Sequence, residues 1–154
     1  MEHPETLDCA CPCGTSRFVV RGAPLIRMIC HCTICQAVYR NPFADIVALR
    51  IGQVERPVDP QIQFRKHRPP PNVARGVCPS CDNPVVGFMS IPIFGVAFVP
   101  AVNFPGDVEL PAPSLHIFYR SRVDDIADTL PKYSGYWSSE WAVSRRILPT
   151  MLGG

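Results

Sequence analysis

The chain has 154 residues and a formal net charge of +2, with 47% hydrophobic and 18% charged residues. This composition excludes a disordered chain dominated by charge, and the near-neutral balance gives no reason to expect a nucleic-acid partner. The length predicts a single domain over residues 1–154. The 18 prolines exclude a helical bundle, because proline inside a helix costs about 3 kcal/mol.

The N-terminus and the apolar runs bear on cellular location. Residues 1–8 are polar and acidic and lack the apolar core of a signal peptide. The longest apolar run, Ile91–Val102, is interrupted by Pro92, Gly95 and Pro100, and it is shorter than the roughly 20 residues that a membrane span needs. We therefore expect a cytoplasmic protein with reduced thiols and no membrane segment.

Short runs rich in β-branched and aromatic residues, bounded by turn residues, recur along the chain and predict a mostly β fold. The predicted strands, in chain order, are Phe18–Val20, Leu25–Ile29, Ala44–Ile51, Gln61–Arg65, Val73–Val77, Val85–Met89, Gly95–Phe104 and Leu115–Tyr119.

Two helices are predicted. The first, Thr33–Arg40, ends where a proline follows Asn41, because the residue before proline disfavours the α region. The second, Ser138–Leu148, has Ser138 or Ser139 as its N-cap. Its apolar contacts are expected from Trp141, Ile147 and Leu148.

Eight cysteines are unusual for a chain of this length. Seven of them fall in three groups, Cys11-Pro12-Cys13, Cys30-His31-Cys32-Thr33-Ile34-Cys35 and Cys78-Pro79-Ser80-Cys81, and Cys9 is the eighth. In a chain without a secretion signal, thiols at such short spacings indicate metal binding rather than disulfides.

The Cys78–Cys81 segment has the form of a zinc knuckle, a turn that directs two sulfurs at one point. Structural zinc has four ligands, so a second pair is needed. Residues i and i+2 of an extended segment point to the same side, and Cys11 and Cys13 can therefore supply that pair. The sequence predicts a structural zinc on Cys11, Cys13, Cys78 and Cys81.

Cys30, Cys32 and Cys35 are then left together within six residues. Three protein ligands and an open fourth position are typical of catalytic zinc, and the open position can take a substrate oxygen or thiolate. His31 and Cys9 remain alternatives for a fourth ligand that would close the site. We expect two zinc ions per chain, the second held by three ligands less firmly and partly missing from the purified protein.

These residues resemble a known family. The matching segments are Cys11-Pro12-Cys13-Gly14, Cys30–Cys35, Pro42-Phe43, Arg75–Cys81, His116-Ile117-Phe118 and Leu130-Pro131-Lys132-Tyr133. From about Cys9 to Tyr136 the chain is similar to the glutathione-dependent formaldehyde-activating enzyme family, which also contains centromere-protein-V-like members. The resemblance implies a β-tent fold of several coiled antiparallel sheets with short helices, and the same two zinc sites.

The resemblance also implies an activity. In the family, formaldehyde and glutathione are joined as S-hydroxymethylglutathione, a carbon–sulfur lyase reaction, and the glutathione thiol can occupy the free position of the second zinc. The chain departs from the family pattern at three positions: Asp82 and Arg40 stand where glycine is usual, and Cys9 adds a thiol. Asp82 fits a left-handed turn, which Asp tolerates better than most residues.

Three further residues and one acidic run have expected roles. His31 is expected to point away from the metal, either as a hydrogen-bond donor behind the ligands or as a surface histidine. His116 is expected to be a packed, hydrogen-bonded histidine, and Arg75 either a structural hydrogen-bond donor or a contact for a glutathione carboxylate. The acidic run Asp124, Asp125 and Asp128 is expected to be a solvated face.

The leading hypothesis is a zinc-dependent enzyme that joins or releases a small thiol and an aldehyde, with Cys30, Cys32 and Cys35 holding the catalytic zinc. The alternative is a non-catalytic zinc-binding module that interacts with protein or nucleic acid. A third reading, methionine sulfoxide reductase, does not fit, because its zinc ligands come as two CxxC pairs.

Overall fold

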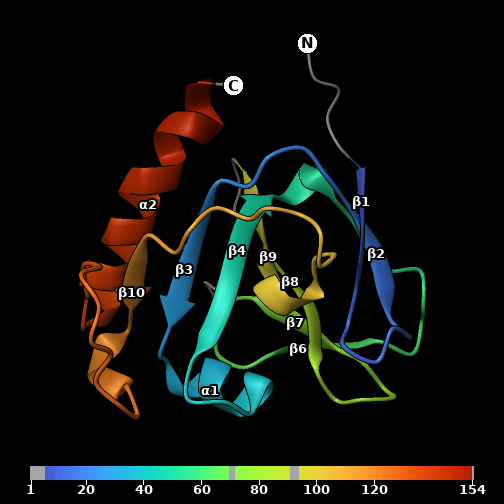
Figure 1. The fold of residues 1–154 in the computed structure, drawn as a ribbon, viewed down its shortest axis with the longest axis horizontal. Coiled ribbons are helices and arrows are strands. Elements are labelled where there is room, and N and C mark those ends of the chain that lie inside the picture. The colour runs from blue at the N-terminus through green and yellow to red at the C-terminus, as the bar shows by residue number, and fades with distance from the viewer. Residues whose placement is uncertain (1–5, 70–71, 91–93, 154) are drawn as a thin grey trace.

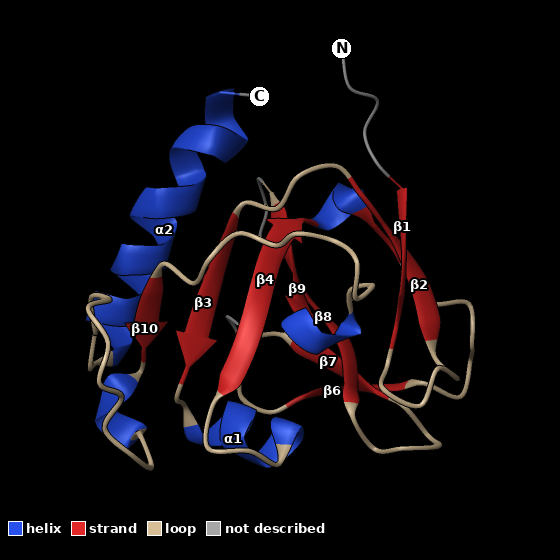
Figure 2. Ribbon diagram, viewed as in Figure 1, coloured by secondary structure: helices blue, strands red, loops and turns tan. Residues whose placement is uncertain are grey.

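The computed structural model describes residues 6–69, 72–90 and 94–153. Over these residues the chain forms ten strands, two α-helices and three short 3-10 helices, arranged as two sheets with one long helix along the side (Figures 1 and 2). The mostly β fold with several sheets is confirmed. No helix in this described part is long and apolar enough to cross a membrane, and residues 91–93 of the apolar run lie outside it.

The smaller sheet has the order β1-β2-β5 and is antiparallel. Its strands are β1 (Thr6–Ala10), β2 (Arg17–Arg21) and β5 (Val54–Glu55). Of these strands, only β2 is predicted from the sequence. β1 contains the polar residues Thr6 and Asp8 and β5 is two residues long, so both form through pairing with β2 rather than through their own composition.

The larger sheet has the order β10-β3-β4-β9-β8-β7-β6. Its strands are β3 (Ile26–Cys30), β4 (Ala44–Arg50), β6 (Gln63–Lys66), β7 (Ala74–Val77), β8 (Pro84–Ser90), β9 (Gly95–Pro100) and β10 (Leu115–Ile117). All of its pairs are antiparallel except β10 with β3, where Leu115 lies opposite Met28 in a parallel register.

Three predicted strands end earlier than expected because the chain turns into a 3-10 helix. The strand β4 is followed by η1 (Ile51–Gln53), β9 by η2 (Ala101–Asn103) and β10 by η3 (Tyr119–Ser121). Before η3, Phe118 takes a left-handed conformation with φ of 53°, which ends β10.

The larger sheet separates two apolar cores. Val47 and Leu49 of β4 face one core, which also contains Cys11 and Cys78. The alternate residue Ile46 faces the other core, which contains Cys30. Because successive strand residues point to opposite faces, the two groups of cysteines are associated with different sides of the sheet.

The two helices lie next to the second core. The first helix, α1 (Thr33–Tyr39), ends at Tyr39, one residue before the predicted end, and Arg40 is its C-cap. The second helix, α2 (Tyr136–Gly153), packs Ala142 and Ile147 into the core and runs along β10 and β3 (Figure 1).

The start of α2 differs from the prediction. The helix begins at Tyr136, so neither Ser138 nor Ser139 is its N-cap. Ser139 is instead buried, and its Oγ accepts a hydrogen bond of 2.8 Å from the Phe118 N–H. Trp141, predicted as an apolar contact, is 62% exposed because it lies on the outer face of the helix.

Candidate metal centres and an adjoining cavity

The first cysteine group contains Cys11, Cys13, Cys78 and Cys81, whose sulfur atoms all lie within 4.8 Å of one another. The Sγ atoms of Cys11 and Cys13 are 3.4 Å apart, and those of Cys13 and Cys78 are 3.7 Å apart. No disulfide joins them. Four thiols gathered at one point can hold a metal ion.

Each half of the first group is a tight turn. The Gly14 N–H donates to the Cys11 carbonyl at 2.9 Å, and the Asp82 N–H donates to the Cys78 carbonyl at 2.9 Å. Both turns pass through the left-handed region, with φ of 80° at Gly14 and 61° at Asp82. The expectation that Asp82 fills a left-handed position is confirmed.

The second group contains Cys30, Cys32 and Cys35, whose sulfurs also lie within 4.8 Å of one another. Cys30 is the last residue of β3, Cys32 is the N-cap of α1, and Cys35 lies in the first turn of α1. The Cys32 sulfur accepts a hydrogen bond of 3.3 Å from the Cys35 N–H. The step from strand to helix therefore brings three thiols together within six residues, and this group also can hold a metal ion.

The thiols of the second group differ in acidity. Hydrogen bonds from the Cys30 and Cys35 thiols lower the pKa of Cys32. The pKa of Cys30 is raised, first by its hydrogen bonds to the other two thiols and then by burial. The guanidinium of Arg75 lies 3.8 Å from the Cys35 sulfur and puts a positive charge beside the group. The lowered pKa of Cys32 favours the ionised thiol that metal ligation requires.

Neither alternative for a fourth ligand joins the second group. Within the described residues, the group has only its three cysteines. Cys9 is buried in β1, where burial raises the pKa of its thiol to about 12, and it packs in the other core. His31 is also buried, but its ring is hydrogen-bonded to His116 and does not join the three sulfurs.

The ring of His31 is part of a chain of polar side chains. Its Nε2 lies 2.8 Å from Nδ1 of His116, and Nε2 of His116 lies 2.8 Å from Oδ2 of Asp128. Lys132 Nζ donates to Asp128 Oδ1 at 2.6 Å, and the Tyr119 ring packs edge-on against His31. His116 is the packed, hydrogen-bonded histidine that was expected. Asp128 was expected only as part of a solvated face, but its carboxylate accepts hydrogen bonds from His116 and Lys132.

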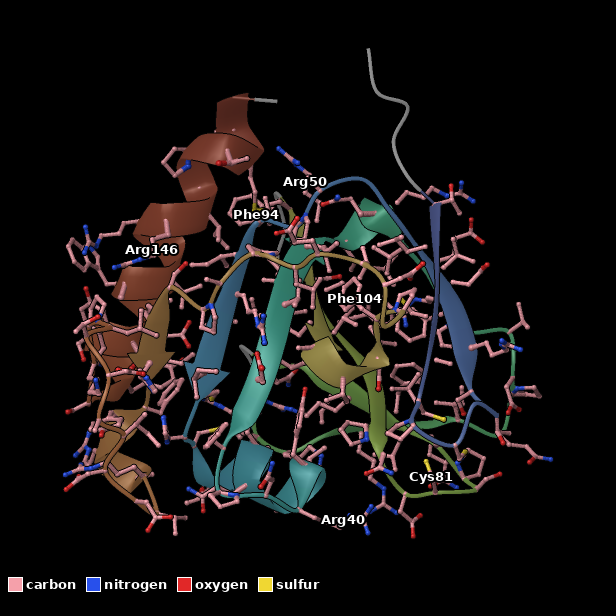
Figure 3. The ribbon with its side chains drawn as sticks, in the orientation of Figure 1. Arg40, Arg50, Cys81, Phe94, Phe104 and Arg146 are labelled. Carbon is pink, nitrogen blue, oxygen red and sulfur yellow. The ribbon has the colours of Figure 1, made fainter. Side chains whose placement is uncertain are left out.

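Arg40 connects the two cysteine groups. It takes a left-handed conformation with φ of 52° at the end of α1, and its Nη2 donates to the Cys81 carbonyl at 3.2 Å and to Asn83 Oδ1 at 3.1 Å. Figure 3 shows Arg40 and Cys81 at the same end of the molecule. Arg40 thus links the helix of the second group to the knuckle of the first.

A cavity of about 480 Å³ adjoins the second group. Cys30, Cys32, Cys35 and Arg75 line it, and the first group does not. Its other walls come from β3, β4, β7, β8, β9 and α2. Since these segments are far apart in the sequence, the cavity could not be predicted from spacing.

Sequence reasoning missed three polar residues at this cavity: Arg68, Tyr136 and Glu140. Arg68 stacks on the Tyr136 ring, with its guanidinium carbon 4.7 Å from the ring centroid. Burial raises the pKa of the Glu140 carboxyl, and the charge of Arg68 opposes that rise. No spacing pattern connects Arg68 with α2, so only the fold reveals this cluster.

Comparison with known proteins agrees with this arrangement. No curated protein matches the chain closely enough to be counted as a relative. The family model described as glutathione-dependent formaldehyde-activating enzyme matches residues 6–121, which include both cysteine groups and Arg75. The match covers more than half of the chain, so the chain belongs to the glutathione-dependent formaldehyde-activating enzyme family.

Proposed function

We propose that the protein is a zinc-dependent enzyme of the carbon–sulfur lyase type, which joins an aldehyde and a thiol or releases them from their adduct. The family description supports glutathione as the thiol and formaldehyde as the aldehyde. We further propose that residues 1–154 act as one domain in the cytoplasm, on small molecules rather than on nucleic acid.

The first group fits a closed structural site. A Zn–S bond of 2.3 Å in a tetrahedron places the sulfurs about 3.8 Å apart. The separations of 3.4 Å and 3.7 Å among Cys11, Cys13 and Cys78 are close to that value. We assign a structural zinc to these residues and Cys81.

One observation carries the functional proposal. Of the two groups, only the one with three cysteines borders the cavity of about 480 Å³. Catalytic zinc sites combine three protein ligands with a position open to substrate, whereas structural sites are closed. This supports Cys30, Cys32 and Cys35 as the ligands of a catalytic zinc.

The proposed reaction is an addition that needs no other reactant. A bond forms between the thiol sulfur and the carbonyl carbon, and the thiol proton ends on the carbonyl oxygen. Zinc bound at the second group would supply a Lewis acid that lowers the pKa of an entering thiol, which is about 8.5 in water. Arg75 offsets the negative charge of the three cysteines, and the cavity holds both reactants close together.

Exchange spectroscopy by NMR tests the proposal. With the zinc-loaded protein, the exchange rate between glutathione and S-hydroxymethylglutathione in the presence of formaldehyde should exceed the uncatalysed rate. In cobalt-loaded protein, glutathione should shift the sulfur-to-metal charge-transfer band. Uncatalysed exchange and an unchanged band together would overturn the proposal and favour a non-catalytic zinc-binding module.

A further inference from the structure

The cavity beside the second group is much larger than formaldehyde requires. Its volume of about 480 Å³ lies in the range of roughly 300–1,000 Å³ that is typical of sites for drug-sized molecules. Formaldehyde has two heavy atoms and would leave nearly all of this space unfilled. A reactant larger than formaldehyde must therefore fill most of the cavity, and the chemistry of the walls decides whether that reactant is the thiol or the aldehyde.

The walls of the cavity are mainly apolar. The sheet contributes Met28, Ile46, Val96 and Phe98, and α2 contributes Val143 and Ile147. Met28, Ile46, Val96 and Ile147 are buried and belong to the second core. Such walls stabilise a ligand through burial of its own apolar surface, worth about 0.8 kcal/mol for each methylene group.

The charged residues of the cavity occupy two places. Arg75 is beside the Cys35 sulfur. Arg68 is exposed, so it lies where the cavity meets solvent, and Glu140 and Tyr136 are its neighbours there. A guanidinium and a carboxylate at the opening complement a thiol that carries carboxylate and ammonium groups, as glutathione does. The apolar walls are then left to the other reactant.

We infer that the preferred aldehyde of this enzyme is larger than formaldehyde and carries an apolar body, an alkyl chain or aromatic ring of about six to ten carbons, which the apolar walls enclose. The carbonyl carbon lies at the second cysteine group and the body extends between the sheet and α2. This inference rests on the proposed function for the reaction. The adduct forms by the same addition, with the thiol proton passing to the carbonyl oxygen.

A series of aldehydes tests the inference with zinc-loaded protein and glutathione. From propanal to hexanal, kcat/KM should rise about fourfold for each added methylene group. Val143→Phe fills part of the cavity and should lower the ratio of hexanal to propanal activity by about tenfold. Val123→Phe makes the same change at an exposed valine and should leave this ratio unaltered.

A binding measurement separates this inference from the proposed function. Calorimetric titration with 1-hexanol, an unreactive probe, should show tighter binding than 1-propanol, and Val143→Phe should weaken it by about tenfold. Activity with formaldehyde but no dependence on chain length in either assay overturns the inference and leaves the function standing. Chain-length-dependent alcohol binding without turnover of any aldehyde supports the apolar site and overturns the function. If kcat/KM instead rises with the chain length of an apolar thiol and not with that of the aldehyde, the assignment of the apolar walls to the aldehyde is overturned.

Discussion

The Nε2 atom of His31 lies 2.8 Å from Nδ1 of His116, and this hydrogen bond links the tautomers of the two rings. Because the Asp128 carboxylate only accepts, Nε2 of His116 carries a proton. In a neutral His116 ring, Nδ1 is then the acceptor, and His31 donates to it through Nε2–H. The Nδ1 atom of His31 is then a buried acceptor that has no hydrogen-bond partner among the residues that the structure describes. The residue between two proposed zinc ligands is therefore held by a chain that ends at an exposed acid.

Stability in acid should depend on Asp128. Hydrogen bonds from Lys132 and His116 hold the pKa of its carboxyl below the ordinary value of 3.8. A group whose pKa is lowered by folding stabilises the fold above its unfolded pKa, and this contribution is lost as the pH falls through the folded pKa. We expect Asp128→Asn to lower stability at neutral pH and to flatten the fall in stability below pH 3.8.

Urea unfolding over this range of pH measures both effects. Asp124→Asn, at an exposed neighbour, is the control and should change neither. An Asp128→Asn variant with the acid dependence of the unsubstituted protein would contradict the role given to this carboxylate.

Cys78→Ser should prevent folding. Cys78 and Cys81 join β7 to β8, and Cys11 and Cys13 join β1 to β2, so the first group ties the two sheets together. Structural zinc has an apparent binding free energy of roughly 10–16 kcal/mol, comparable with the whole stability of a domain. The measurements are soluble yield and cooperative melting. Cys9→Ala, at a cysteine outside both groups, should stay folded with unchanged metal content; a Cys78→Ser variant with an unaltered midpoint would refute the structural role.

Cys32→Ser should have a different effect. Its group is confined to one local segment, so loss of the metal frees the start of α1 without separating the sheets. We expect a folded variant that holds about one zinc per chain, because the closed four-cysteine site remains, and that has lost aldehyde–thiol exchange. Metal analysis and circular dichroism report these results. Global unfolding, or two zinc ions with full activity, would mean that the roles of the groups are exchanged.

Arg40 allows backbone strain to be separated from hydrogen bonding. Arg40→Ala keeps a non-glycine residue at φ of 52° and loses the bonds to Cys81 and Asn83. Arg40→Gly loses the same bonds but removes the steric cost of the left-handed conformation, about 1 kcal/mol. Urea unfolding should therefore show Arg40→Gly to be about 1 kcal/mol more stable than Arg40→Ala. Equal stabilities would show that the backbone at this position is unstrained.

The sequence predicted the features that depend on neighbouring residues. The grouping of Cys30, Cys32 and Cys35 follows from spacing, and the end of α1 follows from the Asn41-Pro42 stop. Eight strands were located to within a few residues, because period and turn residues are local signals.

Features that depend on tertiary structure were missed. β1 (Thr6–Ala10) carries Asp8 and becomes a strand through its partner β2. Asp128 was taken as part of a solvated run, since nothing in its neighbourhood identifies His116 as its partner. The start of α2 was misplaced because the serine that resembled a cap, Ser139, bonds instead to the distant Phe118 N–H.

The parallel pairing of β10 with β3 has a consequence for the order of folding. β3 forms its antiparallel pair with the nearby β4, but β10 joins its other edge from residues 115–117. Contacts between such distant segments form late, because the entropy cost of closing the intervening loop comes before the stabilisation that the contacts provide. A chain on the ribosome can therefore possess all eight cysteines, and load the four-cysteine site, well before Ile117 and α2 enclose the second. The first cysteine group would therefore be assembled before the cavity beside the second group is closed.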